Sequence, residues 1–174
     1  MSNPKANESV TDKFVRKVAQ FVTFRVDGQA YAFRIDQIRE IVILNQVTRI
    51  PQVPDYVEGV ANLRGSIIPI INLRTLFGLP TKSLDSDTRT IVVHVGEKLV
   101  GCQVDSVTQV VRIDHDSIRP APDTVTGNGA GYIAGFARVQ EQLVVLLDIN
   151  QLLDPQRLDQ VGRLPVPDAA HPNN

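Results

Sequence analysis

The chain has 174 residues, of which 43% are hydrophobic and 21% are charged, and its net charge at pH 7 is −1. This composition predicts one globular domain or two small ones, without the basic excess of proteins that bind duplex nucleic acid. The one cysteine, Cys102, excludes an internal disulfide and fits a reducing compartment. No apolar run approaches the roughly 20 residues of a membrane-spanning helix, and residues 1–12 are too polar for a secretory signal. We therefore expect a cytoplasmic protein without membrane insertion.

The first half of the chain predicts short strands after a flexible N-terminal tail at residues 1–18. Asp27-Gly28 is a strong signal for a two-residue hairpin, and Arg64-Gly65 predicts a second turn of this kind. Alternating apolar and polar residues, with Asn72 as a helix N-cap, then define the elements. In chain order these are strands at 21–26, 29–35, 59–63 and 66–72 and a short helical turn at 73–77.

The second half of the chain predicts the same series of elements. Gly96-Glu97 and Glu141-Gln142 are the expected turns, and Asp148 is the expected N-cap of a helical turn at 149–153. The expected strands lie at 91–95, 98–104, 135–139 and 143–148. Residues 155–174 hold four prolines among polar residues and predict a flexible C-terminal tail.

The two halves are also copies of one another in sequence. Residues 26–36 align with 95–105, and residues 59–68 align with 135–144. The first copy also has the apolar run around Glu40, and each copy supplies about five short strands. Five short strands close best as a small barrel, because an open sheet would leave exposed edges. We therefore predict an all-β fold of two five-stranded barrels side by side. The expected subdomains span about 19–80 and about 88–154, with a possible crossing of the chain between the barrels.

Residue types that carry catalysis or bind metals are present but not in useful combinations. None of the three histidines has a second ligand at metal-binding spacing, and Cys102 aligns with Phe33 of the first copy, which indicates a buried packing residue. The glycine-rich loop at residues 127–131 lacks the flanking strand and helix of a phosphate-binding loop. We therefore expect no enzyme activity, no metal and no cofactor.

The copies differ at a few polar positions. Glu40 and Arg64 of the first copy align with Gln109 and Gln140 of the second, and Asn62 aligns with Arg138. One interpretation is that these residues are solvated side chains on a barrel exterior. The other is a contact with a protein, because apolar residues flank Glu40 on both sides and because arginine forms bidentate, partly desolvated pairs.

Several segments resemble one known family. The segments at residues 40–41, 46–51, 59–74, 118–122 and 146–153 are similar to those of the CheW-type chemotaxis coupling proteins, and the resemblance covers roughly residues 19–154. It implies a non-enzymatic adaptor of two SH3-like barrels that links methyl-accepting chemoreceptors to the regulatory domain of a CheA-type histidine kinase. The receptor tip is expected in an apolar groove between the barrels.

Together, the differing positions and the resemblance give a set of candidate partner-binding residues: Ile38, Glu40, Ile41, Val42, Gly59, Asn62 and Arg64. The chain departs from the family at Asp123-Thr124-Val125, where relatives often place a large apolar residue that contacts the kinase a second time. Three alternatives stay open at this point: a coupling protein of a non-flagellar pathway such as pilus motility, a regulatory module that lacks its receiver domain, and a barrel that binds nucleic acid.

Overall fold

A computed structural model describes residues 17–123 and 131–153 of the chain, and these residues contain the repeat seen in the sequence. Each copy consists of five strands followed by a one-turn α-helix. The first copy comprises β1 (Val18–Val26), β2 (Gln29–Arg34), β3 (Ile38–Val42), β4 (Val57–Leu63), β5 (Ser66–Asn72) and α2 (Leu73–Leu76). The second comprises β6 (Arg89–Val95), β7 (Lys98–Val104), β8 (Ser106–Asp114), β9 (Ile133–Val139), β10 (Gln142–Leu147) and α4 (Ile149–Leu152). Short 3-10 turns lie at Ile35–Gln37 and His115–Ser117.

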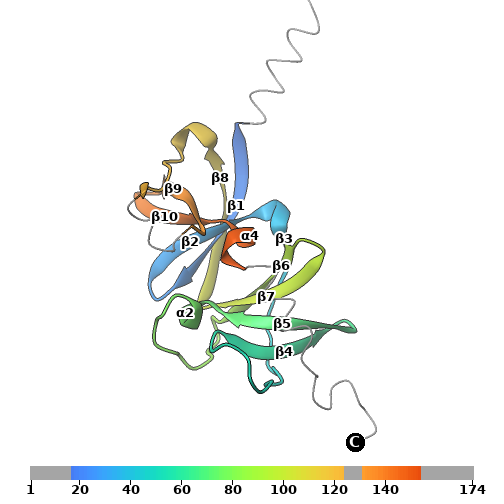
Figure 1. The fold of residues 1–174 in the computed structure, drawn as a ribbon. Helices are drawn as coiled ribbons and strands as arrows, with labels where there is room; N and C mark the ends of the chain where they lie inside the picture. Colours follow the sequence, from blue (N-terminus) through green and yellow to red (C-terminus); the bar gives the residue numbers. More distant parts are fainter. Residues whose placement is uncertain (1–16, 124–130, 154–174) are drawn as a thin grey trace, which may run out of the picture.

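The strands form two five-stranded sheets, and neither sheet is made from one copy. The first sheet has the order β8-β1-β2-β10-β9, and the second has the order β3-β6-β7-β5-β4. In Figure 1 the first sheet lies above the second, and α4 lies near the centre of the molecule. The prediction of an all-β fold with two five-stranded units is thus confirmed.

The sheets do not follow the expected subdomain boundaries. After the β1–β2 hairpin the chain leaves the first sheet, and β3 pairs with β6 of the second sheet. After the β6–β7 hairpin it crosses back, and β8 pairs with β1. The ranges 19–80 and 88–154 therefore describe the repeat in the sequence but not the hydrogen-bonded units, and the crossing that the sequence left open is present.

Two isolated bridges close the sheets into barrels. Thr48, which follows β3, exchanges two backbone hydrogen bonds of 2.8 Å with Val60 of β4. Arg119, which follows β8, does the same with Phe136 of β9. Each bridge joins the two ends of one sheet, so each sheet closes on itself and leaves no long unpaired edge.

The hairpin turns follow their residue types. Asp27 and Gly28 have φ angles of 51° and 79°, and Arg64 and Gly65 have φ angles of 53° and 89°, as two-residue hairpins of this kind require. In the second copy, the positive φ angles of the turn between β9 and β10 belong to Gln140 and Glu141, and β10 begins at Gln142. The prediction of a Glu141-Gln142 turn was therefore wrong by one residue.

The largest hydrophobic cluster lies between the two sheets rather than inside either barrel. It joins Phe24 and Phe33 of the first sheet to Ile91 and Val100 of the second, and all four side chains are fully buried. Leu73 of α2 contributes to the same cluster, and two smaller clusters fill the individual barrels. Because the space between the barrels is packed, the apolar surface associated with it lies at its rim.

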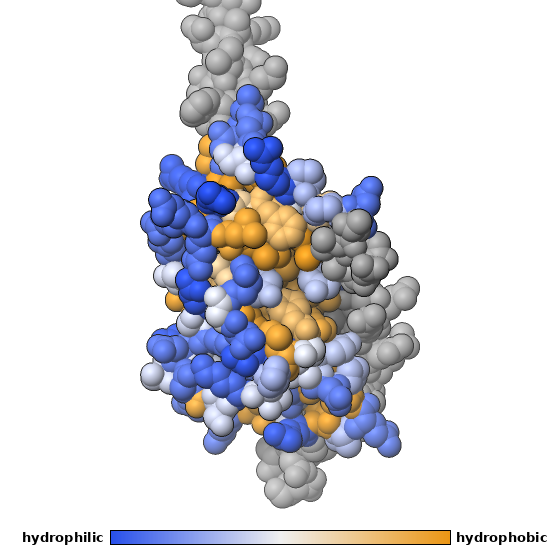
Figure 2. Space-filling view, turned by 90° about the vertical axis from the view of Figure 1, so that its left-hand side faces the viewer, coloured by the Kyte–Doolittle hydropathy of each residue, from blue (hydrophilic) through white to orange (hydrophobic). Residues whose placement is uncertain are grey.

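This rim carries a row of aromatic rings in contact. Phe77, just after α2, lies with its ring centroid 5.1 Å from that of Tyr31 and 5.8 Å from that of Tyr132. All three side chains are partly buried and pack against the cluster between the sheets. Figure 2, which faces the side of the molecule with α2, β9 and β10, shows hydrophobic surface reaching from the first sheet to the second between hydrophilic flanks.

Candidate functional site

Glu40 and Arg64, which the sequence singles out separately, form an ion pair. Glu40 lies on β3 and Arg64 lies in the turn between β4 and β5. The two guanidinium nitrogens Nη1 and Nη2 lie 3.2 and 3.0 Å from the two carboxylate oxygens of Glu40, which makes the pair bidentate. The side chain of Glu40 is 17% exposed and that of Arg64 is 75% exposed, so the pair presents its guanidinium to solvent.

The turn that carries Arg64 is held by Asn62. The Oδ1 atom of Asn62 accepts a hydrogen bond of 2.9 Å from the backbone N–H of Gly65. A side-chain amide that closes a turn in this way replaces a backbone hydrogen bond. Asn62 is exposed, but its carbonyl oxygen is engaged within the turn, so its role here is to orient Arg64 toward β3.

The apolar residues beside Glu40 divide between core and surface. Ile38 packs against the cluster between the sheets, and Val42 packs against the cluster inside the second barrel. Ile41 and Ile43 are instead 39% and 62% exposed. Successive residues of a strand point to opposite faces, so Ile41 is exposed on the face of β3 opposite to Glu40, and Ile43 follows just beyond the strand. The apolar segment around Glu40 therefore exposes Ile41 and Ile43 and buries parts of Ile38 and Val42, and its contact with a partner stays a prediction.

Gly59 does not belong to this surface. It is buried, its φ angle is +146°, and it lies opposite Thr48 in the seam that closes the second barrel. A Cβ atom built at this position would overlap the carbonyl oxygen of Thr48 and lie 2.7 Å from its carbonyl carbon. The physical reason for glycine here is the close approach of two backbones.

The repeat provides an internal control for the ion pair. Gln109 and Gln140 stand at the positions of Glu40 and Arg64 in the second copy, and Gln109 Nε2 donates a hydrogen bond of 3.4 Å to Gln140 Oε1. Both copies therefore make a contact between these two positions, on the strand that crosses to the other sheet and in the hairpin turn. Only in the first copy is this contact made by charged side chains. The sequence did contain a signal for the contact between Glu40 and Arg64. At the aligned positions of the second copy, two glutamines replace the two opposite charges.

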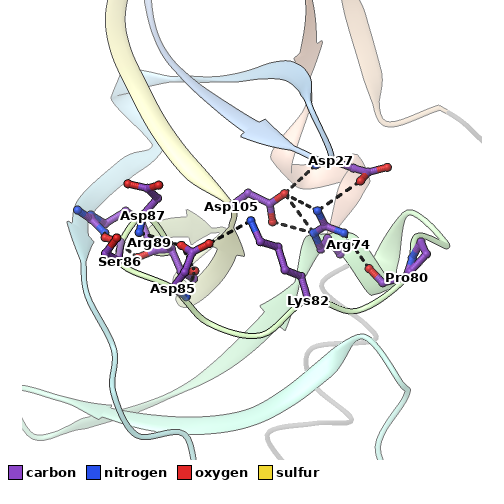
Figure 3. A network of polar contacts seen from close by, with 10 residues as sticks. Asp27, Arg74, Pro80, Lys82, Asp85, Ser86, Asp87, Arg89 and Asp105 are labelled. Carbon is purple, nitrogen blue, oxygen red and sulfur yellow. Dashed lines mark hydrogen bonds and ion pairs between the residues drawn. The ribbon is translucent and has the colours of Figure 1, made fainter.

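A second polar cluster was not predicted from the sequence. Arg74 of α2 donates from Nε and Nη2 to both carboxylate oxygens of Asp105, at distances of 2.8–3.1 Å. Its Nη2 also lies 3.3 Å from the carboxylate of Asp27 in the β1–β2 turn. Figure 3 shows these contacts, with Lys82 reaching Asp85 beside them. Asp105 lies where the chain crosses from β7 to β8, so this cluster ties the two sheets together at the crossing.

The electrostatic effect of this cluster falls on both of its central residues. The hydrogen bond to Asp105 raises the pKa of Arg74 above its usual range. Burial by itself would raise the pKa of Asp105, but hydrogen bonds from Arg74 and from the Asp27 N–H, with the charges of Arg74 and Lys82, lower it. Both groups are thus held in their charged forms.

Residues that could have supported catalysis are placed apart. Cys102 is fully buried, whereas His94 is exposed on β6 and His115 is exposed in the 3-10 turn after β8. No group of three potential metal ligands comes together within residues 17–123 and 131–153. In those same ranges no helix has the length and apolar character needed to cross a membrane. Thr124, Val125, His171, the predicted C-terminal tail and residues 1–16 of the predicted N-terminal tail lie outside the described residues, whereas Val18, the last residue of that predicted tail, already begins β1.

We predict that the Cys102 thiol is inert in the folded protein. Burial raises its pKa to about 12, so almost no thiolate forms near neutral pH, and the side chain is inaccessible to reagents. A thiol-specific chromogenic reagent should therefore react with one thiol per chain only after a denaturant is added. A fast reaction in native buffer would contradict the packing of this strand.

Comparison with known proteins agrees with the fold. A model of the CheW-like domain family matches residues 20–157. The chain is 37% identical over 145 residues to a chemotaxis protein CheW of Klebsiella aerogenes, with 83% of this chain and 87% of that protein covered. It is 36% identical over 137 residues to a chemotaxis protein CheW of Helicobacter pylori, with 79% and 82% covered.

A solved structure shares the architecture. The crystal structure of the scaffolding protein TtCheW from Thermoanaerobacter tengcongensis matches with a TM-score of 0.70 at 30% sequence identity, and the match covers 78% of this chain and 92% of that one. The region that the family model matches, residues 20–157, includes strands of both copies of the repeat and of both sheets. The chain belongs to the CheW-like domain family and is a non-enzymatic scaffolding protein of chemotaxis.

Proposed function

We propose that the chain couples chemoreceptors to their kinase by binding two partners: the cytoplasmic tip of a methyl-accepting chemoreceptor and the regulatory domain of a CheA-type histidine kinase. This assigns it to the cytoplasm, at receptor arrays on the inner face of the membrane. The observation that carries the proposal is the bidentate Glu40–Arg64 pair with its exposed guanidinium, which only the first copy of the repeat has in charged form, on a strand that also exposes Ile41.

The chemistry of this surface suits a specific protein contact. The two exposed isoleucines provide apolar area, and Arg64 keeps hydrogen-bond donors beyond those that it gives to Glu40. A guanidinium already oriented by a carboxylate loses little freedom when a partner's carboxylate joins it. The Glu40–Arg64 pair is therefore a prearranged recognition element more than a stabilising one. Its guanidinium is 75% exposed, so solvent screens the pair and limits its contribution to stability to about 1 kcal/mol.

Coupling requires no chemical step at this surface. A scaffold that fixes receptor and kinase relative to one another transmits a signal if its contacts differ in free energy between two arrangements. Differences of about 1–3 kcal/mol are enough for this, and a few side chains provide them. The shared core between the sheets makes the two barrels move together, so a contact on one barrel is mechanically linked to the other.

We predict that Arg64→Ala weakens partner binding by about 1–3 kcal/mol, or about 5- to 150-fold in Kd, because it removes the exposed guanidinium. Unfolding in urea should show a loss of stability of only about 1 kcal/mol, because Arg64 is 75% exposed and water can take its place at the Glu40 carboxylate. The measurement is binding of the full chain to a kinase regulatory domain and, separately, to a receptor-tip hairpin, with circular dichroism as the check on folding.

Gln140→Ala is the matched control, because it truncates the same turn position in the second copy and removes no charge. It should leave both affinities unchanged. Equal losses of binding in the two variants would contradict the assignment of the site to the first copy. Absence of binding to both partners by the wild-type chain would contradict the proposed function itself.

A further inference from the structure

The two sheets differ in how far their hairpins stay joined. In the first sheet the parallel ladder between β10 and β2 begins at Val144, opposite Ala30. In the second sheet the corresponding ladder between β5 and β7 begins only at Ile70, opposite Gly101. Ile70 aligns with Leu146 rather than with Val144, so the second sheet is unpaired over a longer stretch next to its turns.

A proline explains where the ladder of the second sheet stops. Pro69 stands at the position of Val145, which pairs with Tyr31 in the ladder of the first sheet. Proline has no backbone N–H to donate to the neighbouring strand, so it interrupts a ladder at its position. Beyond Pro69 the β4–β5 and β6–β7 hairpins diverge toward their turns, as Figure 1 shows.

A cavity lies in the space between the two diverging hairpins. Its volume is about 360 Å3, and it is lined by Ser66–Pro69 of β5 and by Glu97–Val100 of the turn and β7. In this stretch Ile67 is 38% exposed, and Leu99 is only partly buried. Closing the cavity would bring these two apolar side chains together and remove them from water. A closed position is therefore favoured by apolar burial, but it lacks the hydrogen bond that Pro69 cannot donate.

Side chains bridge the corresponding gap of the first barrel. Gln29 Nε2 donates hydrogen bonds of 2.9 and 3.0 Å to the carbonyl oxygens of Ala30 and Leu143. Arg25 Nη2 donates a hydrogen bond of 2.9 Å to Oε1 of Gln142. These contacts join the β1–β2 hairpin to the β9–β10 hairpin beside their turns. The same glutamine and arginine bridge cannot form in the second barrel, where the aligned positions hold His94, Lys98 and Ser66.

The β4–β5 tip, residues 62–67, is the hairpin end that carries Arg64. We propose that this tip is a hinged element, which moves between the open position of this structure and a closed position against β7. The hinge lies at Ile68–Ile70, because Ile68 and Ile70 are anchored in the buried cluster of the second barrel. The Arg64 guanidinium changes its position relative to Glu40 as the tip moves, since Glu40 lies on β3, outside the tip.

This inference deepens the proposed function and rests on it. Coupling requires an element with two arrangements that a partner can bias. The β4–β5 tip is such an element, at the position where a partner is expected to bind Arg64. In the second copy the bridge from Gln29 and Arg25 holds the aligned tip in place. The charged contact and the moving element therefore belong to the same copy.

Relaxation dispersion of backbone amides, recorded by NMR on the free full-length chain, tests the motion without a partner. The amides of Arg64, Gly65 and Ile67 should show exchange between two environments in microseconds to milliseconds. The aligned amides of the second copy, in residues 140–143, should show none. Absence of exchange in the wild-type chain, or equal exchange in both tips, would overturn the proposal.

Two variants test whether Pro69 causes the motion. Pro69→Val supplies the missing N–H with the side chain that the second copy has, and it should suppress the exchange while the circular dichroism spectrum stays unchanged. Pro69→Ala supplies the same N–H with a smaller side chain and should act in the same way. Exchange that persists unchanged in both variants would overturn the proposal.

The use of this motion in coupling is measured separately. Pro69→Val should bind a receptor-tip hairpin and a kinase regulatory domain as tightly as wild type does. In a complex of receptor, kinase and this chain, the variant should nevertheless lose receptor control of kinase activity. Control that stays at the wild-type level would overturn the role of the hinge in coupling. Failure of the wild-type chain to bind either partner would contradict the proposed function alone, because the motion is measured in the free chain.

Discussion

Replacing Gly59 with alanine is expected to destabilise the protein by about 3–4 kcal/mol, a large share of the 5–15 kcal/mol of a typical domain. The added Cβ would overlap the carbonyl oxygen of Thr48, and alanine would have to adopt a φ angle of +146°. Neither strain can relax cheaply, because the neighbouring atoms are backbone atoms held by the two hydrogen bonds between Thr48 and Val60. Unfolding in urea, followed by circular dichroism, measures the effect.

Gly65→Ala separates the two sources of strain. Gly65 also has a positive φ angle, +89°, but a Cβ atom there would have no neighbour within 4 Å. Its substitution should therefore cost only about 1 kcal/mol, the price of the backbone conformation alone. If Gly59→Ala were as stable as Gly65→Ala and still lost receptor or kinase binding, Gly59 would act in recognition and the seam would not explain it.

The elements of this fold were accessible from the sequence because their signals are local. Asp27-Gly28 and Arg64-Gly65 need only their own backbone preferences to make tight turns, and Asn72 needs only the N–H of Thr75 to cap α2. The repeat extended these assignments to the second half. The exception, the turn at Gln140-Glu141, has no glycine to mark it, so the position was misassigned by one residue.

The crossing of the chain could not be predicted in the same way. Ile38 and Ile41 of β3 align with Val107 and Val110 of β8, so the apolar pattern is equally satisfied whichever sheet either strand joins. The structure resolves the choice through packing. With β3 and β8 exchanged, Phe24 and Phe33 of the first sheet meet Ile91 of the second in one buried cluster. This cluster joins residues far apart in the chain, so local sequence patterns could not predict it.

The candidate site was predicted in part for a related reason. Glu40 and Arg64 were identified because they differ from Gln109 and Gln140, but their contact across 24 residues depends on closure of the barrel. Arg74 gave no signal, since an arginine in a short helical turn ordinarily faces water. Its 14% exposure follows from the position of Asp105 at the crossing, which the sequence left undecided.

Arg74→Ala is expected to cost about 2–3 kcal/mol of stability at neutral pH. The substitution leaves the carboxylate of Asp105, which is only 17% exposed, without its bidentate partner, and an unpaired charge of this kind is expensive. Arg34→Ala is the matched control, because Arg34 pairs with Asp36 at 3.1 Å with both side chains at least half exposed. That variant should lose less than about 1 kcal/mol.

The pH dependence tells whether the loss comes from this charge. Because the folded protein lowers the pKa of Asp105, its ionisation stabilises the fold above the unfolded-state pKa, and that stabilisation is lost as the pH falls through the folded-state pKa. In Arg74→Ala the hydrogen bonds and the charge of Arg74, which lower this pKa, are gone, while the burial that raises it remains together with the Asp27 N–H and Lys82. The gap in stability between wild type and variant should therefore be widest near neutral pH and should narrow in acid, where Asp105 is protonated in both. A gap that stays constant from neutral to acidic pH would mean that Arg74 stabilises the crossing through packing of its side chain and not through Asp105.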